Sequence, residues 1–251
     1  MNARKRVFRS FLIVIGLAAV SCSLAKGPGL GGGISGSKVI QTETRHPGTF
    51  EAITLEYPAD ITIQQGAEDV VWIQADDNLI AQISSDVTSG RLIIKTTESD
   101  WRERVNPSEQ VKIGITAKNP KEIALAAPDG ILRVNDLKGG TLKLVLSGGG
   151  QIFVTGIQVD LLDAVLSGAG DIQIAGTADE VTVLLSGWGN FNAADLAAKK
   201  ASVDLSGAGA AVVRVERELL AKINGAGSVK YYGSPHVEQT LTGGGSIKPA
   251  E

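Results

Sequence analysis

Three aspartates, Asp163, Asp171 and Asp204, lie among the Gly-rich segments of the second half of the chain. Carboxylates at such positions raise the question of polysaccharide cleavage, which requires two carboxyl groups on either side of one glycosidic bond. The three aspartates, however, take different positions in the sequence repeat described below. We therefore expect solvated turn residues, and a polysaccharide-acting enzyme ranks last among the functions considered.

Cysteine and histidine are too scarce for most other site chemistry. The 251-residue chain has one Cys, Cys22, and two His, His46 and His236. These numbers exclude a disulfide scaffold and a Cys/His zinc site, and they disfavour Cys-His or Ser-His-Asp catalysis. A calcium-binding β-roll requires a regular Asp after each Gly pair, whereas only one copy here has it, at Asp171. The sequence thus predicts a protein that is not an enzyme, with no metal and no cofactor.

One motif recurs six times: apolar, Ser/Thr/Asn, Gly, any, Gly, any, apolar. The copies begin at Leu146, Leu166, Leu185, Leu205, Ile223 and Leu241, which are 20, 19, 20, 18 and 18 residues apart. A weaker copy without the glycine pair covers 125–131. Such a period is typical of repeat architectures in which each unit stacks on the next. It predicts an all-β fold, a parallel β-helix (solenoid) with coils of about 18–20 residues. A three-sided and a two-layered cross-section both fit this short period.

Alternation within each copy indicates strands. The positions two and four before each leading residue, and six after it, are apolar with one exception, so we expect them to point into the core. The glycines mark corners, where we expect them to supply the positive φ that other residues resist. The corner glycines are Gly148, Gly150, Gly168, Gly170, Gly187, Gly189, Gly207, Gly209, Gly225, Gly227, Gly243 and Gly245.

A single head domain is expected over 38–251, with an irregular β part (38–125) and the regular repeats (126–247). Within the irregular part we predict strands over 50–55, 60–64, 70–75, 91–96 and 111–117. This part could form irregular coils of the same solenoid. It could also cap the stack, because repeat proteins need a cap at each open end.

The N-terminus predicts an export signal over 1–21, with a basic start and an apolar run too short to span a bilayer. Cys22 matches the lipid-modified cysteine of bacterial lipoproteins; cleavage after Ala25 is the alternative. Residues 22–37 then form a Gly-rich tether. Ser23 lacks the acidic character of an inner-membrane retention signal, which favours the outer membrane for the lipid anchor. A soluble periplasmic or secreted protein is the alternative. Without 1–21 the chain carries 20 basic and 27 acidic residues, a net −7 that argues against nucleic acid and anionic lipid.

The segments Phe50-Glu51-Ala52-Ile53 and Asp60-Ile61-Thr62-Ile63, followed by the serial Leu-Ser-Gly-x-Gly-x-Ile copies, carry a family resemblance. Over about 48–247 the chain resembles the bacterial family called the putative autotransporter adhesin head, or GIN, domain. The resemblance implies an exported β-helical protein, often a lipoprotein, and it implies no catalytic residues.

Two features could form a binding surface. Val145, Val165 and Leu184 each precede a leading residue, so they should face outward and form one apolar row. Residues 37–125 could instead cover that row. Trp188 lies between two corner glycines, where its ring is either exposed or folded back over the corner. We expect a non-enzymatic envelope binding or adhesion module, its partner a glycan or an envelope protein. A structural protein that self-associates as a homo-oligomer is the alternative.

Overall fold

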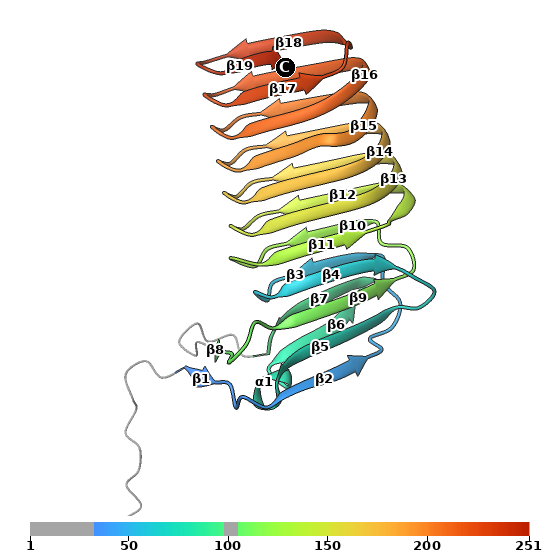
Figure 1. Ribbon diagram of the computed structural model, residues 1–251, viewed down its shortest axis with the longest axis vertical. Helices are drawn as coiled ribbons and strands as arrows, with labels where there is room; N and C mark the ends of the chain where they lie inside the picture. The colour runs from blue at the N-terminus through green and yellow to red at the C-terminus, as the bar shows by residue number, and fades with distance from the viewer. Residues whose placement is uncertain (1–32, 98–104, 251) are drawn as a thin grey trace, which may run out of the picture. The chain divides into compact units, whose positions relative to one another are not determined.

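The computed structural model describes residues 33–97 and 105–250, which form a stack of β-coils (Figure 1). The predicted signal peptide, Cys22 and most of the predicted tether lie outside the described residues. Ile34–Ser35 (β1) pairs in parallel with Val105–Asn106 (β8). Part of the range expected for the tether therefore lies against the head domain.

Each regular coil has two layers, so the cross-section is that of a flattened solenoid. One long strand enters after a tight corner, crosses a wide bend and returns to the next corner. Four strands do this: β13 (Gln151–Leu166), β14 (Asp171–Leu185), β15 (Asn190–Leu205) and β16 (Ala210–Asn224). Glycines with positive φ lie at two of the wide bends, Gly156 (70°) and Gly176 (142°). Figure 1 shows the tight corners along one edge of the stack and the wide bends along the other.

Parallel pairing joins the coils into two facing sheets. The first sheet holds the halves that follow each tight corner, and the second sheet holds the halves that precede the next one. Shorter strands complete the regular part: β10 (Glu122–Leu125), β11 (Ile131–Asn135), β12 (Lys138–Leu146), β17 (Ser228–Tyr232), β18 (His236–Thr242) and β19 (Ser246–Pro249). The all-β solenoid expected from the repeat period is confirmed.

Pairing register places the predicted inward columns in rows along the stack. Leu142, Leu162 and Val181 are paired partners, as are Leu146, Leu166 and Leu185, and all six are at most 1% exposed. The two sheets bury these rows against each other, which supplies the hydrophobic stabilisation of the fold. In the weaker copy, Leu132 rather than Ile131 takes the buried place, because the corner is one residue longer.

Residues 38–125 both extend the solenoid and close its N-terminal end. The coil of β3 (Ala52–Leu55) and β4 (Asp60–Gln65) pairs in parallel with β10 and β11 on one side. On its other side it pairs in parallel with β7 (Arg91–Thr96) and β9 (Lys112–Ala117). Three antiparallel strands follow: β2 (Ile40–Arg45), β5 (Val70–Asp76) and β6 (Ile83–Thr88). They cap the stack together with the short helix α1 (Asp77–Ile80).

Asp76, fully buried at the end of β5, links two distant segments at the cap, those of Lys38 and Ser108. Its carboxylate accepts hydrogen bonds from the Ser108 hydroxyl (2.6 Å), the Ser108 amide (2.9 Å) and the Lys38 amide (2.7 Å). The Ser108 hydroxyl contributes most to lowering the pKa of Asp76, and burial opposes it. A buried carboxylate is tolerated here because it is hydrogen-bonded on both oxygens.

The corner glycines are required for a reason that differs from the one expected. Among the twelve, only Gly243 has positive φ (113°), so the expected role in supplying positive φ is wrong for the others. At the other corners the backbone of the preceding coil lies directly against the glycine. A Cβ on Gly168, Gly187 or Gly207 would come within 3.0 Å of a glycine carbonyl oxygen in the preceding corner. Glycine therefore permits close approach of backbones rather than a special φ.

The last coil is built like the others but leaves one side of its core row open. Leu241 is 49% exposed, whereas Ile223, its partner in the previous coil, is 1% exposed. Val237 and Ile247 are half-buried. Strands β18 and β19 each have a described partner strand on one side.

Candidate binding surfaces

The apolar row predicted from parity exists on the outer face of the second sheet. We call Val145, Val165 and Leu184 the apolar strip. They are successive register partners, and Ala124 of β10 continues the row. Leu184 is 43% exposed, and both valines are half-buried. The row ends at Asp204 and Lys222 on the next two coils.

Residues 37–125 do not cover the apolar strip. Strands β12, β13 and β14 make their extensive contacts with neighbouring coils, and the irregular part is stacked at the end of the solenoid (Figure 1). The half-burial of Val145 and Val165 therefore comes from neighbouring side chains on the same sheet. The strip is an outward surface that a partner can reach.

A polar groove lies on the opposite sheet, and the sequence analysis did not single it out. It is a hollow of about 280 Å³ on three successive coils. It is lined by the positions five and seven after the leading residues Leu146, Leu166 and Leu185, which lie on β13, β14 and β15 above the buried Ile172. We call it the amide groove; its outward residues are Gln151, Phe153, Asp171, Gln173, Asn190 and Asn192.

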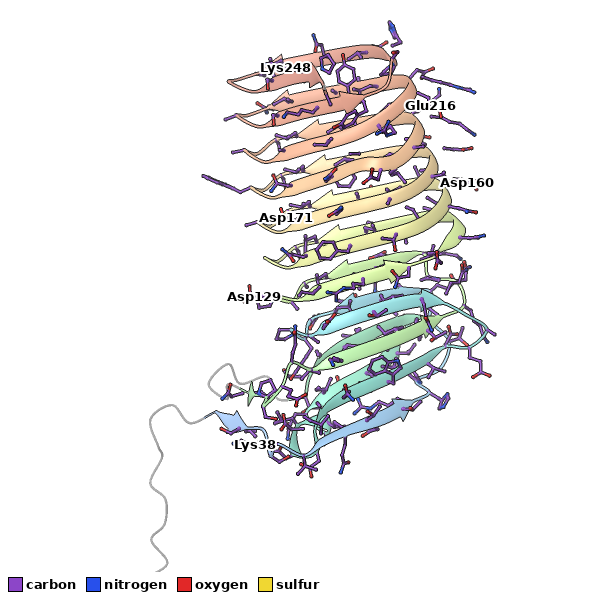
Figure 2. The ribbon with its side chains drawn as sticks, in the orientation of Figure 1. Lys38, Asp129, Asp160, Asp171, Glu216 and Lys248 are labelled. Carbon is purple, nitrogen blue, oxygen red and sulfur yellow. The ribbon has the colours of Figure 1, made fainter. Side chains whose placement is uncertain are left out.

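One hydrogen bond organises the mouth of the amide groove. The Asn190 side-chain amide donates to the Asp171 carboxylate over 2.8 Å, from one coil to the next. Both side chains are exposed. Figure 2 shows Asp171 beside the tight corner, on the same edge of the stack as Asp129 and away from Asp160 and Glu216 at the wide bends. The groove thus lies beside the row of corners.

Trp188 stands at that same edge, two residues before Asn190. Its backbone amide donates to the Gly168 carbonyl (3.1 Å), and its side chain is 80% exposed. The side chain therefore projects from the corner rather than folding over it. Trp72 behaves differently, because its indole lies against Gly114 and is used in packing.

The three aspartates of the repeat region do not form one site. Asp163 and Asp204 lie on the second sheet in different rows, and Asp171 lies on the first sheet. Among residues 33–97 and 105–250, no group of three or more His, Cys, Asp or Glu side chains could hold a metal ion. No helix within those ranges is both long and apolar enough to cross a membrane.

Two titratable groups away from Asp76 have shifted pKa values with clear physical causes. A hydrogen bond from Lys200 (2.8 Å) and its charge lower the pKa of Glu218, an exposed residue at the wide-bend side of the second sheet. Burial raises the pKa of Tyr57, and the Asp76 charge adds to this. Neither group lies in the apolar strip or in the amide groove.

A family model described as "Putative auto-transporter adhesin, head GIN domain" matches residues 49–235. The chain belongs to this family. The match covers the first complete coil, the cap apart from β2, and most of the regular repeats, so the resemblance carried by the Leu-Ser-Gly-x-Gly copies is confirmed. No curated protein matches this GIN domain.

Solved structures share the architecture of this GIN domain over most of its length. A "putative adhesin" from Bacteroides fragilis is 25% identical with a TM-score of 0.80; the match covers 87% of this chain and all of that one. A "putative lipid binding protein" from Parabacteroides distasonis is 24% identical with a TM-score of 0.72, covering 87% and 99%. A "putative adhesin" from Parabacteroides merdae is 21% identical, with a TM-score of 0.64 and the same coverage. The latter two show the fold alone.

Within the GIN domain, the residues singled out from the sequence fall on two different surfaces. The apolar strip occupies the second sheet, while Trp188 borders the first sheet at the corner. The amide groove was missed because the search followed charged and apolar residues. Its signal was present in the repeat: across three successive copies, positions five and seven after the leading residue carry Gln, Asp or Asn at every place except Phe153.

Proposed function

We propose that this GIN domain is a non-enzymatic binding or adhesion module of the bacterial cell envelope. It is held at the outer membrane by a lipid on Cys22 and a Gly-rich tether, and it contacts an envelope protein through the flank of its solenoid. The family and the similarity to the Bacteroides fragilis adhesin support an adhesive role. The leader, the cysteine and the tether of the sequence support the anchor.

The observation that carries this proposal is the uncovered apolar strip. Three register partners place apolar side chains in one row on the outside of a sheet, and one of them, Leu184, is 43% exposed. Apolar rows facing outward on a soluble domain are typical of partner contacts. The rigid parallel ladder holds the side chains in place before binding, which lowers the entropy lost on association.

Val165→Lys tests the strip at its centre. The change places an ammonium in the middle of the contact, so cells carrying the variant should lose attachment to immobilised envelope fragments. Ser202→Lys is the matched control, because Ser202 faces outward from the same sheet in a different row. Attachment of the control should match the wild type. Circular dichroism of both purified variants and surface labelling of the cells establish equal folding and equal display.

A folded Val165→Lys variant that attaches like the wild type would contradict the proposal. Light scattering of the same proteins separates the partner from a second copy of the chain. If the wild type shows a mass that rises with concentration and Val165→Lys does not, the strip joins copies of the chain, and the structural alternative replaces adhesion to another protein.

Cys22→Ala tests the anchor. The wild type should incorporate radioactive palmitate and partition into detergent, whereas the variant should do neither. Unlabelled, fully soluble wild type would overturn the anchor while leaving the adhesive surface intact.

A further inference from the structure

We propose that the amide groove is a binding site for a neutral carbohydrate chain that lies across three coils. This inference goes beyond the proposed function, because the groove lies on the first sheet and the apolar strip on the second. The two surfaces therefore can be tested independently.

The side chains that line the groove match the hydrogen-bonding needs of sugar hydroxyls. A hydroxyl both donates and accepts, and each Asn or Gln amide offers two N–H donors and a carbonyl acceptor in one plane. Gln151, Gln173, Asn190 and Asn192 place four such amides in two adjacent rows. Asp171 adds a carboxylate that accepts from Asn190 through one oxygen and leaves further acceptor capacity for a ligand.

The charge of the groove selects against other ligand classes. Asp171 is the one charged residue lining the hollow, so phosphate, sulfate or uronate groups would meet a carboxylate and no cation. Arg133 is the register partner of Phe153 on the preceding coil, but its guanidinium forms an ion pair with Asp60. An acyl chain would cover the four amides and leave them without hydrogen-bond partners, which is unfavourable for each buried polar group. A neutral polyhydroxylated ligand satisfies them all.

The groove is held rigid before a ligand arrives. Its residues alternate with core side chains along the strands: Ile152, Ile172 and Phe191 are each at most 1% exposed. The Asn190–Asp171 hydrogen bond fixes two of the polar groups relative to each other. Preorganisation of this kind reduces the ordering cost that weakens binding on open surfaces.

Two aromatic rings complete the match to a sugar chain. Phe153 is half-buried at the N-terminal end of the groove, and Trp188 projects at the corner that leads into Asn190. An exposed indole offers a flat apolar face with a polar edge, which suits the C–H face of a pyranose ring. Successive coils are about 4.8 Å apart, so an extended glycan running along the stack would present about one ring per coil.

The groove ends where the two rows no longer carry amide or carboxylate side chains. Ala210 and Val212 occupy the same two rows on the coil above β15, and Ile131 and Arg133 occupy them on the coil below β13. The predicted ligand contact thus covers about three sugar units, placed by the two rows on β13, β14 and β15.

The test measures binding of the full-length protein to soluble neutral polysaccharides: β-glucan, xylan, mannan and galactan. Affinity gel electrophoresis and the tryptophan fluorescence of the wild type report binding. At least one polymer should bind, and Gln173→Ala at the centre of the groove and Trp188→Ala at its edge should each weaken it about tenfold. Lys230→Ala is the matched control, because Lys230 lies in the row of Gln173 but two coils beyond the groove. The control should bind like the wild type.

Salt and charge provide further readouts. Binding of the neutral polymer should change less than twofold between 0.05 and about 0.5 M NaCl, because charge attraction is screened over this range. The proposal is overturned if none of the four polymers binds, or if Trp188→Ala and Gln173→Ala bind as well as the control. It is also overturned if polygalacturonate or phospholipid vesicles bind at the groove in place of the neutral polymers. Val165→Lys should leave glycan binding unchanged. The glycan site in the amide groove and the adhesive role of the apolar strip can therefore be refuted separately.

Discussion

The same substitution, glycine to alanine, can be made at Gly168, where the new methyl group meets backbone, and at Gly149, where it meets open space. Both belong to tight corners of neighbouring coils, and neither has positive φ. The methyl group of Gly168→Ala would come within 3.0 Å of the backbone of Gly148 in the coil below. The methyl group of Gly149→Ala would have no atom within 4 Å. Any difference in stability between the two variants therefore reports the contact between coils.

The expected free energies follow from these contacts. Overpacking against backbone costs about 1–3 kcal/mol, because a backbone carbonyl in a ladder has little room to move. Moving it would also stretch the corner hydrogen bonds from Ser167 to Leu146 (3.0 Å) and from Asp171 to Gly150 (3.2 Å). Both variants gain about 0.4–1 kcal/mol from a less flexible unfolded chain. Gly168→Ala should therefore destabilise the fold, and Gly149→Ala should stabilise it slightly.

Thermal unfolding of the full chain, followed by circular dichroism at pH 7, measures the difference. For a domain of this size each kcal/mol shifts the Tm by about 2–4 °C. The Tm of Gly168→Ala should fall by several degrees, while that of Gly149→Ala should stay equal or rise. Coincident melting curves for the two variants, or a lower Tm for Gly149→Ala, would refute the idea that the corner glycines set the approach of the coils.

Three further outcomes are expected. The contribution of Asp76 to stability is present above its unfolded-state pKa, near 3.8, and is lost as the pH falls through its lowered folded-state pKa. Asp76→Asn should therefore have a lower Tm than the wild type at pH 7, and the gap between the two melting temperatures should begin to close only below about pH 4, as the pH falls toward the lowered folded-state pKa; a pH-independent gap would contradict this. Leu241→Lys should change the free energy of unfolding by less than about 0.5 kcal/mol in urea titrations, because Leu241 is half exposed. Leu205→Lys in the same row should abolish folding, because it buries an unpaired ammonium; a folded Leu205→Lys would show that the row is not core. In subcellular fractions, Cys22→Ala should move the protein from the membrane to the soluble fraction; an unchanged distribution would show that Cys22 does not anchor it.

The regular half of the fold could be predicted because each copy repeats the same physical requirement. Apolar residues at a period of two, and glycines at a fixed offset, define the strand faces and the corner, so the inward rows and the outward row of Val165 follow from parity alone. The reason for the glycines could not be read in this way. Gly168 is constrained by the carbonyl oxygen of a residue 20 positions earlier, and such a contact becomes visible only once the coils are stacked.

Strands of the N-terminal half were predicted from their apolar patterns, but the order in which they pair was not, for a different reason. Its strands over 52–55 and 112–117 have clear apolar patterns, but their pairing is not sequential. The coil of β3 and β4 lies between β10–β11 and β7–β9, and Asp76 reaches Ser108 across 32 residues. No local pattern encodes an order of this kind. The amide groove was equally hidden, because Gln173 and Asn192 are ordinary surface residues until the register makes them neighbours.

That insertion of β3–β4 between later strands has a consequence for how the chain folds. The first coil gains its complete neighbour on one side only once the chain up to residue 117 is available, since both β7 and β9 must pair with it from below. Strands β10 and β11 pair with the distant β3 and β4, but from residue 138 onward each new strand pairs with one that lies about one coil earlier in the sequence and is already in place. Slow, non-local closure at the N-terminal cap should thus be followed by rapid addition of coils in the order of synthesis. We therefore expect the cap to be the folding nucleus. Each coil that has formed then serves as the template on which the strands of the next coil pair.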